Sequence, residues 1–138
     1  AMDHVFGYSV FNDGSIRDYQ RHTHQFTPGK NFPNSGSFGP HIVTADEAGN
    51  IPSKKITTKV NDVLVQDSTL DQLVFDVAQL ISYCSEWTTL QPGDVIVTGT
   101  PGGVGDSRDP KLWLFPGDVV EVEVEGIGRL VNQVTEEI

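Results

Sequence analysis

The stretch FNDGSIRDYQ, residues 11–20, gathers two aspartates, an arginine and a glutamine directly after the apolar run Val5–Val10. Carboxylates such as those of Asp13 and Asp18 bind hard divalent cations, or accept hydrogen bonds from backbone amides in a turn. Two interpretations follow: a polar surface turn, or one wall of an active site.

A second candidate is the glycine-rich segment VTGTPGGVG, residues 97–105. Its four glycines let backbone N–H groups approach a bound anion, and Thr98 and Thr100 add hydroxyl groups. It is not a P-loop, because no Gly-Lys-Ser/Thr ends it, and residues 106–110 do not open the helix that a dinucleotide fingerprint needs. The segment is therefore either a wide turn or a loop that binds a carboxylate or phosphate.

Three further groups of residues are of types that could take part in chemistry. Lys30 follows a Pro-Gly turn and precedes Phe32, so we expect its side chain to lie against an aromatic ring. His22 and His24 alternate as a pair of zinc or copper ligands would, but no cysteine or carboxylate lies close by, which favours an exposed loop.

The run VEVEVE at residues 120–125 alternates valine with glutamate. A strand with this period turns its valines to the core and its glutamates to the opposite face. Two carboxylates on one face can hold a divalent ion, but like charges on an open face also protect an edge strand from aggregation. We expect the glutamates to be solvated.

The elements that position these residues are mostly short strands. We expect strands at 5–11, around 41–44, at 56–60 and at 63–66, with Asn61-Asp62 as a two-residue hairpin turn between the last two. LQPGDVIVTG and LFPGDVVEVEVEG both predict a Pro-Gly-Asp turn followed by a strand of β-branched residues. Apolar residues spaced three and four apart predict one long amphipathic helix over about 69–87, with Thr69 and Gln72 as its capping box. The predicted class is α+β, mostly β, in a single domain over residues 1–138.

Composition narrows the function. Nine basic and nineteen acidic residues give a net charge of −10, which argues against nucleic acid or an anionic membrane as a partner. The single cysteine, Cys84, fits a reducing compartment, and no apolar stretch reaches the roughly 18 residues of a membrane span. We expect a soluble cytoplasmic protein.

Several motifs, taken together and in order, resemble the fumarylacetoacetate hydrolase family over nearly the whole chain. They are GYSVFNDGSIRDYQ, GKNF, GPHIVTADE, KVNDVLVQD, QPGDVIVTGTPGGVG and PGDVVEVEVEGIGRLVNQV. The resemblance implies a mixed β-sandwich roll, usually paired into a homodimer. It also implies an enzyme that acts on short 2-oxo or 2,4-dioxo acids through bound Mg²⁺ or Mn²⁺.

By the same resemblance, Asp13 occupies the place of the metal-binding aspartate, and Arg17 and Gln20 match residues that contact substrate. Lys30 matches a lysine near the metal and the reacting carbonyl. Gly99 and Thr100 match the loop that holds the substrate carboxylate. A 2-oxo acid can chelate the cation, which then polarises the carbonyl and stabilises the enolate that bond cleavage leaves, while Lys30 and Arg17 add fixed positive charge.

The chain departs from the family pattern in one respect. The family's Glu-x-Glu metal ligands and its His–Glu base precede the Asn12-Asp13 motif, and this sequence offers only Asp3 and His4 there. We therefore expect the C-terminal portion of a larger catalytic domain. The leading hypothesis is metal-dependent hydrolysis of a carbon–carbon bond in a 2,4-dioxo acid of the acylpyruvate or fumarylacetoacetate type. The alternatives are an isomerase or decarboxylase of a 2-oxo-hept-ene-dioate type acid in aromatic catabolism, and a non-catalytic binding module.

Overall fold

The computed structural model describes residues 1–136, whose strands form two sheets with antiparallel pairing. β1 (Gly7–Asp13) pairs with β2 (Gly36–Thr44) in the smaller sheet. The larger sheet has the order β4-β3-β5-β6 and consists of β3 (Lys55–Val60), β4 (Val63–Thr69), β5 (Val119–Val124) and β6 (Gly128–Gln133). The α+β class, mostly β, is confirmed.

The helices are short and lie outside the sheets. They are α1 (Arg17–Gln20), α2 (Ala45–Ala48) and α3 (Val77–Trp87), with single 3₁₀ turns η1 (Met2–His4), η2 (Thr27–Gly29), η3 (Leu70–Gln72) and η4 (Gly105–Ser107). Within residues 1–136, no helix has the length and apolar character that crossing a membrane requires.

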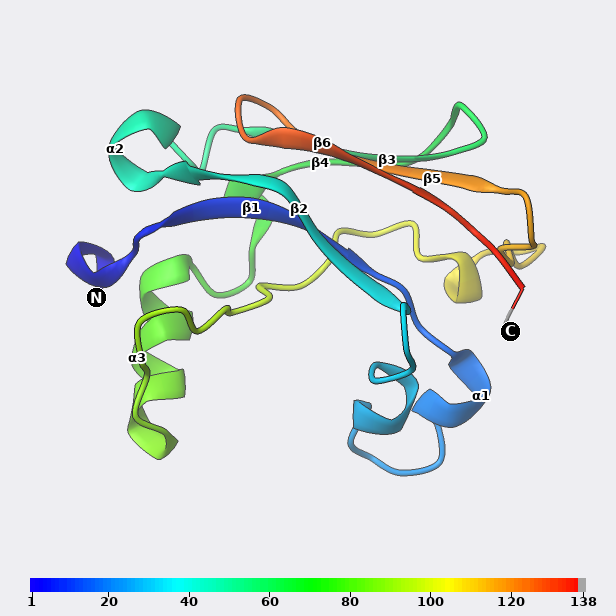
Figure 1. Cartoon of the computed structure of the whole chain (residues 1–138), viewed down its shortest axis with the longest axis horizontal. Helices are drawn as coiled ribbons and strands as arrows, with labels where there is room; N and C mark the ends of the chain where they lie inside the picture. Colours follow the sequence, from blue (N-terminus) through cyan, green and yellow to red (C-terminus); the bar gives the residue numbers. More distant parts are fainter. Residues whose placement is uncertain (137–138) are drawn as a thin grey trace.

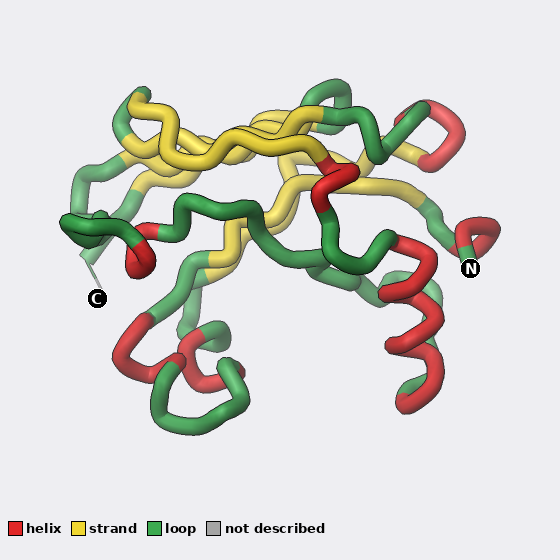
Figure 2. Tube along the Cα trace, turned by 180° about the vertical axis from the view of Figure 1, so that it is seen from behind, coloured by secondary structure: helices red, strands yellow, loops and turns green. Residues whose placement is uncertain are grey.

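The two sheets pack face to face around one core. Figure 1 shows β1 and β2 crossing beneath the larger sheet, with α3 and α1 projecting away from that sheet at opposite ends, and Figure 2 gives the same arrangement from behind. β1 contacts β5 and β6, and β2 contacts β6. The buried apolar side chains that fill the space are Val10, Ala48, Val60, Val120, Val122, Val124, Ile127 and Leu130.

The hairpin predicted at Asn61-Asp62 is confirmed. Both residues have positive φ, 49° and 65°, as a primed two-residue turn requires. Val60 lies opposite Val63 across the turn, and the register shifts between Thr58 and Lys59. The smaller sheet differs slightly from prediction: β1 starts at Gly7 and extends to Asp13, because Asn12 and Asp13 pair with Ser37 and Gly36 of β2.

Both Pro-Gly-Asp turns form in the same way. In each, glycine has a φ near 100°, the aspartate N–H donates to the carbonyl three residues earlier, and the aspartate carboxylate accepts from that residue's N–H. Only the second turn leads into a strand. Residues 95–98 pair with no strand within residues 1–136, so the predicted strand there is wrong. The turn forms from hydrogen bonds among its own residues, whereas a strand also needs a neighbouring strand with which to pair.

The long helix is present but starts later than predicted. Residues 70–72 form a separate 3₁₀ turn, Leu73 is extended (ψ 129°), and α3 begins at Val77. The capping box is made by Asp76 and Gln79 rather than by Thr69 and Gln72: the Asp76 carboxylate accepts from the Gln79 N–H, and the Gln79 amide oxygen accepts from the Asp76 N–H. The apolar spacing is the same on both sides of this break, so it could not reveal the start.

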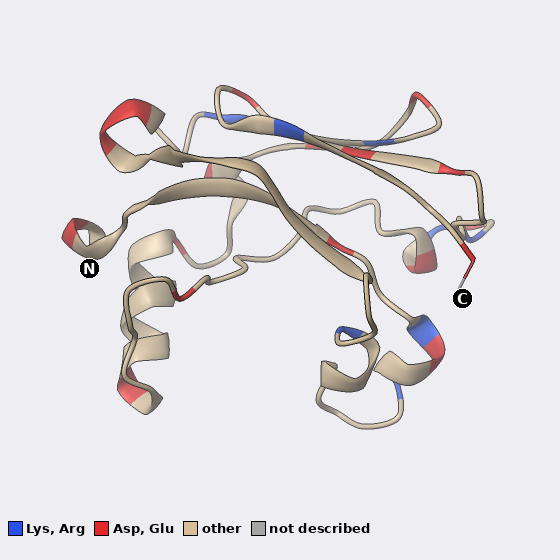
Figure 3. Ribbon diagram, in the orientation of Figure 1, with Lys and Arg blue, Asp and Glu red and all other residues tan. Residues whose placement is uncertain are grey.

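The glutamates of β5 are not all solvated. Figure 3 shows acidic positions on β5 as well as on α1 and α2. Glu121 is 7% exposed, because Arg129 donates to its carboxylate and the Lys59 Nζ lies 3.6 Å from its Oε1. The hydrogen bond from Arg129 holds the pKa of the Glu121 carboxyl below its usual value. The valines at 120, 122 and 124 are buried as predicted.

Candidate active site

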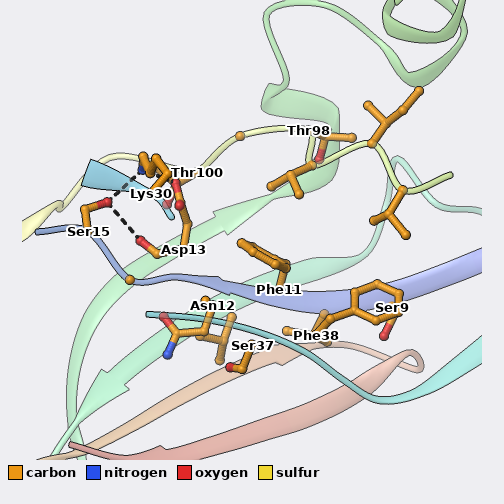
Figure 4. A pocket seen from close by; sticks show the side chains of 18 of the residues that line it. Ser9, Phe11, Asn12, Asp13, Ser15, Lys30, Ser37, Phe38, Thr98 and Thr100 are labelled. Carbon is orange, nitrogen blue, oxygen red and sulfur yellow. Dashed lines mark hydrogen bonds and ion pairs between the residues drawn. The ribbon is translucent and has the colours of Figure 1, made fainter. Parts of the chain in front are cut away.

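Asp13 and Lys30 form an ion pair where β1 leaves the smaller sheet. The Lys30 Nζ lies 2.5 Å from the Asp13 Oδ2 and donates to the Ser15 Oγ at 2.7 Å. Figure 4 shows these three side chains converging. The Asp13 side chain is 39% exposed and that of Lys30 28%, so both remain accessible to a small molecule. Among residues 1–136 the Lys30 ammonium makes this ion pair and no cation–π contact with an aromatic ring. Phe32 packs edge-on against Tyr19 with ring centroids 4.7 Å apart.

Two glycines allow the close backbone packing around this pair. A side chain at Gly14 would meet the Ser35 carbonyl oxygen, and one at Gly29 would meet the backbone and Cβ of Gln20. The N–H of Ile16 donates to the Gly29 carbonyl at 3.0 Å. These contacts bring the η2 turn, and with it Lys30, against the segment that carries Asp13.

Arg17 and Gln20 face each other on α1. The Arg17 Nη1 donates to the Gln20 side-chain oxygen, and Gln20 is 7% exposed. The Arg17 Nε is buried and makes no hydrogen bond, but the Oδ2 of Asp106 lies 3.8 Å from it. A guanidinium held in this way can bind a carboxylate or a polarised carbonyl oxygen.

The glycine-rich loop is fastened by side chains from β4 and from its own far end. The Gln66 amide donates to the Thr100 hydroxyl at 3.0 Å and to the Pro101 carbonyl at 2.9 Å. Arg108 donates to the carbonyls of Gly103 and Val65. Gly103 has a φ of 102°, and a side chain there would meet the Val65 carbonyl, so the loop can approach β4 only with glycine at this position.

The N–H groups of Gly99 and Thr100 are free to bind a ligand: within residues 1–136 they donate to no protein acceptor. Gly99 has a φ of 111° and no atoms within 4 Å of where a side chain would start. Open backbone donors of this kind suit an anionic oxygen. This favours the anion-binding interpretation of the loop over a plain turn.

The predicted site residues all line one hollow of about 2430 Å³, which is much larger than a short acid needs. Its lining includes residues of the smaller sheet, of α3 and of the segment at 94–106, as well as residues of the larger sheet. Within it, two of the expected pairs touch, Asp13 with Lys30 and Arg17 with Gln20, whereas Thr100 contacts Gln66. The roles that the resemblance assigns to these residues stay predictions.

Asp13, the predicted metal ligand, is one of several carboxylates that line the hollow. Within residues 1–136, no three His, Cys, Asp or Glu side chains cluster closely enough to hold an ion, and Asp13 is already paired with Lys30. Mg²⁺ is held by one or two carboxylates together with water and substrate oxygens. Asp13 therefore fits as one metal ligand, but the described residues do not make a complete metal site.

The other candidates take no part in this arrangement. His22 and His24 are exposed, and the ring of His22 packs against that of Tyr19 with centroids 4.8 Å apart. Glu121 and Glu123 lie on the larger sheet, where the Glu121 carboxylate is occupied by Arg129 and Lys59.

Three residues of the site were missed by sequence reasoning. Ser15 belongs to the motif Asn-Asp-x-Ser-x-Arg-Asp-x-Gln, which was a sufficient signal for it. Gln66 and Asp106 had no local signal, because the contacts that link them to Thr100 and to Arg21 join residues more than 30 positions apart. A hydrogen bond from Lys111, together with the charges of Arg21 and Arg17, holds the pKa of the Asp106 carboxyl below its usual value.

Comparison with known proteins agrees with this architecture. The family model "Fumarylacetoacetate (FAA) hydrolase C-terminal" matches residues 1–135. The chain is 43% identical over 136 residues to the mitochondrial oxaloacetate tautomerase FAHD2B of Bos taurus, covering 97% of this chain and 43% of that protein. The mitochondrial relative leaves the cytoplasmic location of this chain a prediction.

Two solved structures superpose closely. Fumarylacetoacetate hydrolase from Exiguobacterium antarcticum has a TM-score of 0.94 and 43% identity, covering 99% of this chain and 49% of that one. Maleylpyruvate hydrolase from Sphingobium sp. SYK-6, in complex with manganese(II) and pyruvate, has a TM-score of 0.82 and 32% identity, covering 96% and 45%. The chain thus spans about half the length of the relatives it matches. It belongs to the fumarylacetoacetate hydrolase family, and its residues correspond to the family's C-terminal fold.

Proposed function

We propose that the protein is an enzyme that acts on short 2-oxo acids through an enolate, and that it hydrolyses a carbon–carbon bond in a 2,4-dioxo acid. The observation that carries the proposal is the placement of the Asp13–Lys30 pair and the Arg17–Gln20 pair on one hollow, together with free backbone donors at Gly99 and Thr100. Family membership supports the substrate class.

In this proposal, each group has one task. The N–H groups of Gly99 and Thr100 hold the substrate carboxylate. Arg17 and Gln20 hold an oxygen of the dioxo unit, and the Lys30 ammonium stabilises negative charge on the 2-oxo oxygen as it develops. The oxygen of water bonds to the C4 carbonyl carbon and the C3–C4 bond breaks. The electron pair of the broken C3–C4 bond stays on C3 and gives the enolate of pyruvate, which takes up a proton. C4 leaves as the carbon of a carboxylic acid.

We further propose a divalent cation, Mg²⁺ or Mn²⁺, as cofactor, with Asp13 as one ligand. When bound, such an ion supplies Lewis-acid polarisation of the keto oxygen. The manganese and pyruvate held by the Sphingobium enzyme support this choice. Asp13 alone does not make a complete site, so water and substrate oxygens would supply other ligands. The homodimer implied by the family stays a prediction.

The test is release of pyruvate from acetylpyruvate, followed with a coupled lactate dehydrogenase assay with and without Mg²⁺. Lys30→Met should lower kcat/KM by about 10²–10³-fold, the usual cost of losing one donor to a developing oxyanion. Lys55→Met is the matched control, because Lys55 lies on the larger sheet and pairs with Asp67 outside the hollow. No pyruvate from a panel of acylpyruvates, with metal present, would reject the hydrolase proposal.

Keto–enol tautomerisation of a 2-oxo dicarboxylic acid is the second candidate. It needs no activated water, only transfer of a proton between C3 and the 2-oxo oxygen. The bovine relative is an oxaloacetate tautomerase. Loss of enol absorbance from oxaloacetate, without pyruvate release, identifies this reaction.

The remaining alternatives are separated by the same experiments. Release of CO₂ identifies a decarboxylase, and a shifted diene absorbance identifies an isomerase. Calorimetric binding of oxalate, an enolate mimic, without turnover of any acid in the panel identifies a binding module.

A further inference from the structure

Asp106 lies directly after the glycine-rich loop, in η4, and its side chain is only 10% exposed. Three cationic groups from two separate segments surround it. Arg21 donates to its Oδ2, the Lys111 Nζ lies 2.6 Å from its Oδ1, and the Arg17 Nε lies 3.8 Å from its Oδ2. It is thus the point at which the end of the loop meets the helix α1.

The orientation of Arg17 depends on what surrounds its guanidinium. One side is fixed, because Nη1 donates to Gln20. The Nε is buried. Among residues 1–136 it is the only buried side-chain nitrogen or oxygen that has no hydrogen-bond partner. Asp106 is the carboxylate that faces it, and a shift of about 1 Å would bring 3.8 Å to the usual length of an N–H···O bond.

We propose that Asp106 is a positioning residue for Arg17 and ties the glycine-rich loop to the Arg17–Gln20 helix. This inference rests on the proposed function, in which Arg17 contacts the substrate and the loop holds its carboxylate. Both ends of a short acid can be bound together only when these two segments keep a fixed separation, and misplacement of about 1 Å costs roughly 10²-fold in rate.

The charges around Asp106 indicate that its carboxylate orients the Arg17 guanidinium without cancelling the positive charge of the cluster. One carboxylate meets three cations, so the cluster keeps an excess of positive charge in a chain whose net charge is −10. Arg17 is held by Asp106 without being fully neutralised, and can still attract an anionic substrate.

The test compares Asp106→Asn with Asp106→Glu and with the control Asp109→Asn. Asp109 is an exposed carboxylate three positions along that makes no ion pair within the described residues. We expect Asp106→Asn to raise KM for the substrate about 10-fold with a smaller change in kcat. Asp106→Glu should restore KM to within about threefold of the wild type, since it keeps the charge. Asp109→Asn should change neither. Partial unfolding alone would lower apparent kcat and leave KM unchanged.

A second readout does not depend on turnover. The Nε–H signal of Arg17 in a ¹⁵N spectrum, assigned with Arg17→Lys, should exchange with solvent markedly faster in Asp106→Asn than in the wild type or Asp109→Asn. An unchanged exchange rate and an unchanged KM in folded Asp106→Asn protein would overturn the inference. A wild type that turns over no 2-oxo acid would instead reject the proposed function, and the exchange rate would still decide whether Asp106 holds Arg17.

Discussion

Replacing Gly14 with alanine tests whether the Asp13–Lys30 geometry depends on close backbone packing. A Cβ at Gly14 would fall about 1 Å short of the 3.0 Å separation that such atoms keep from a neighbour, and the atom that it meets is the Ser35 carbonyl oxygen, which belongs to the backbone. Something must therefore move by about 1 Å. Gly14 lies between Asp13 and Ser15, the two residues that accept hydrogen bonds from Lys30. The displacement should therefore move these two acceptors relative to the Lys30 ammonium.

Gly14→Ala should lower both the free energy of unfolding and kcat/KM. Forcing an extra methyl into a packed site costs about 1–3 kcal/mol of the free energy of unfolding. With an m-value of about 2 kcal/mol/M in urea, a loss of about 2 kcal/mol lowers the unfolding midpoint by about 1 M. A displacement of about 1 Å among reacting groups lowers kcat/KM by roughly 10²-fold.

The assay is urea unfolding followed by circular dichroism, with pyruvate release measured on the folded variant. Gly102→Ala is the control for the unfolding midpoint alone, because a side chain at Gly102 meets nothing within 4 Å and its φ is not in the left-handed region. A Gly14→Ala variant with the midpoint of this control and the kcat/KM of the wild type would show that the packing around Asp13 does not set the geometry of the site.

Two further predictions concern stability. The pKa of Glu121 is lowered in the fold, first by its hydrogen bond from Arg129, so its contribution is fully present above the ordinary value of 4.5 and is lost as pH falls through the lower folded value. The urea midpoint of the wild type should therefore exceed that of Glu121→Gln at pH 7 and approach it near pH 3, and an offset independent of pH would contradict the ion-pair explanation. Asp76→Ala removes the capping box of α3 and should cost about 1 kcal/mol, whereas Glu86→Ala in the same helix should cost a few tenths at most; equal costs would contradict the cap.

Local chemistry explains the parts of the fold that the sequence predicts well. Asn61 and Asp62 tolerate positive φ, so the hairpin between β3 and β4 follows from two adjacent residues. Period-two valines in β5 predict which face is buried. Each of these rules uses only neighbours along the chain.

The parts that sequence missed depend on distant partners. Glu121 is buried because Lys59 and Arg129 reach it across two strand pairings, which its own alternation cannot reveal. Residues 95–98 have the composition of a strand and the correct turn before them, yet no strand pairs with them within residues 1–136. In the site, the motif residues were identified by resemblance, while Asp106 meets Arg17 across 89 positions of chain.

The site is held in place partly by backbone pairing and partly by side-chain contacts between distant segments. Asp13 is fixed by the ladder of the smaller sheet, where it pairs with Gly36, so its position is a property of the backbone. The glycine-rich loop has no such ladder; Gln66 and Arg108 fasten it to β4, and Asp106 fastens its end to α1. Side-chain tethers are easier to change than a ladder without unfolding the core, because each can be removed by one substitution. In the proposed function, the separation between Asp13 and the N–H groups of Gly99 and Thr100 is therefore set mainly by three side chains. We expect variation at these three positions to be the simplest way to change the length of the acid that the site would accept.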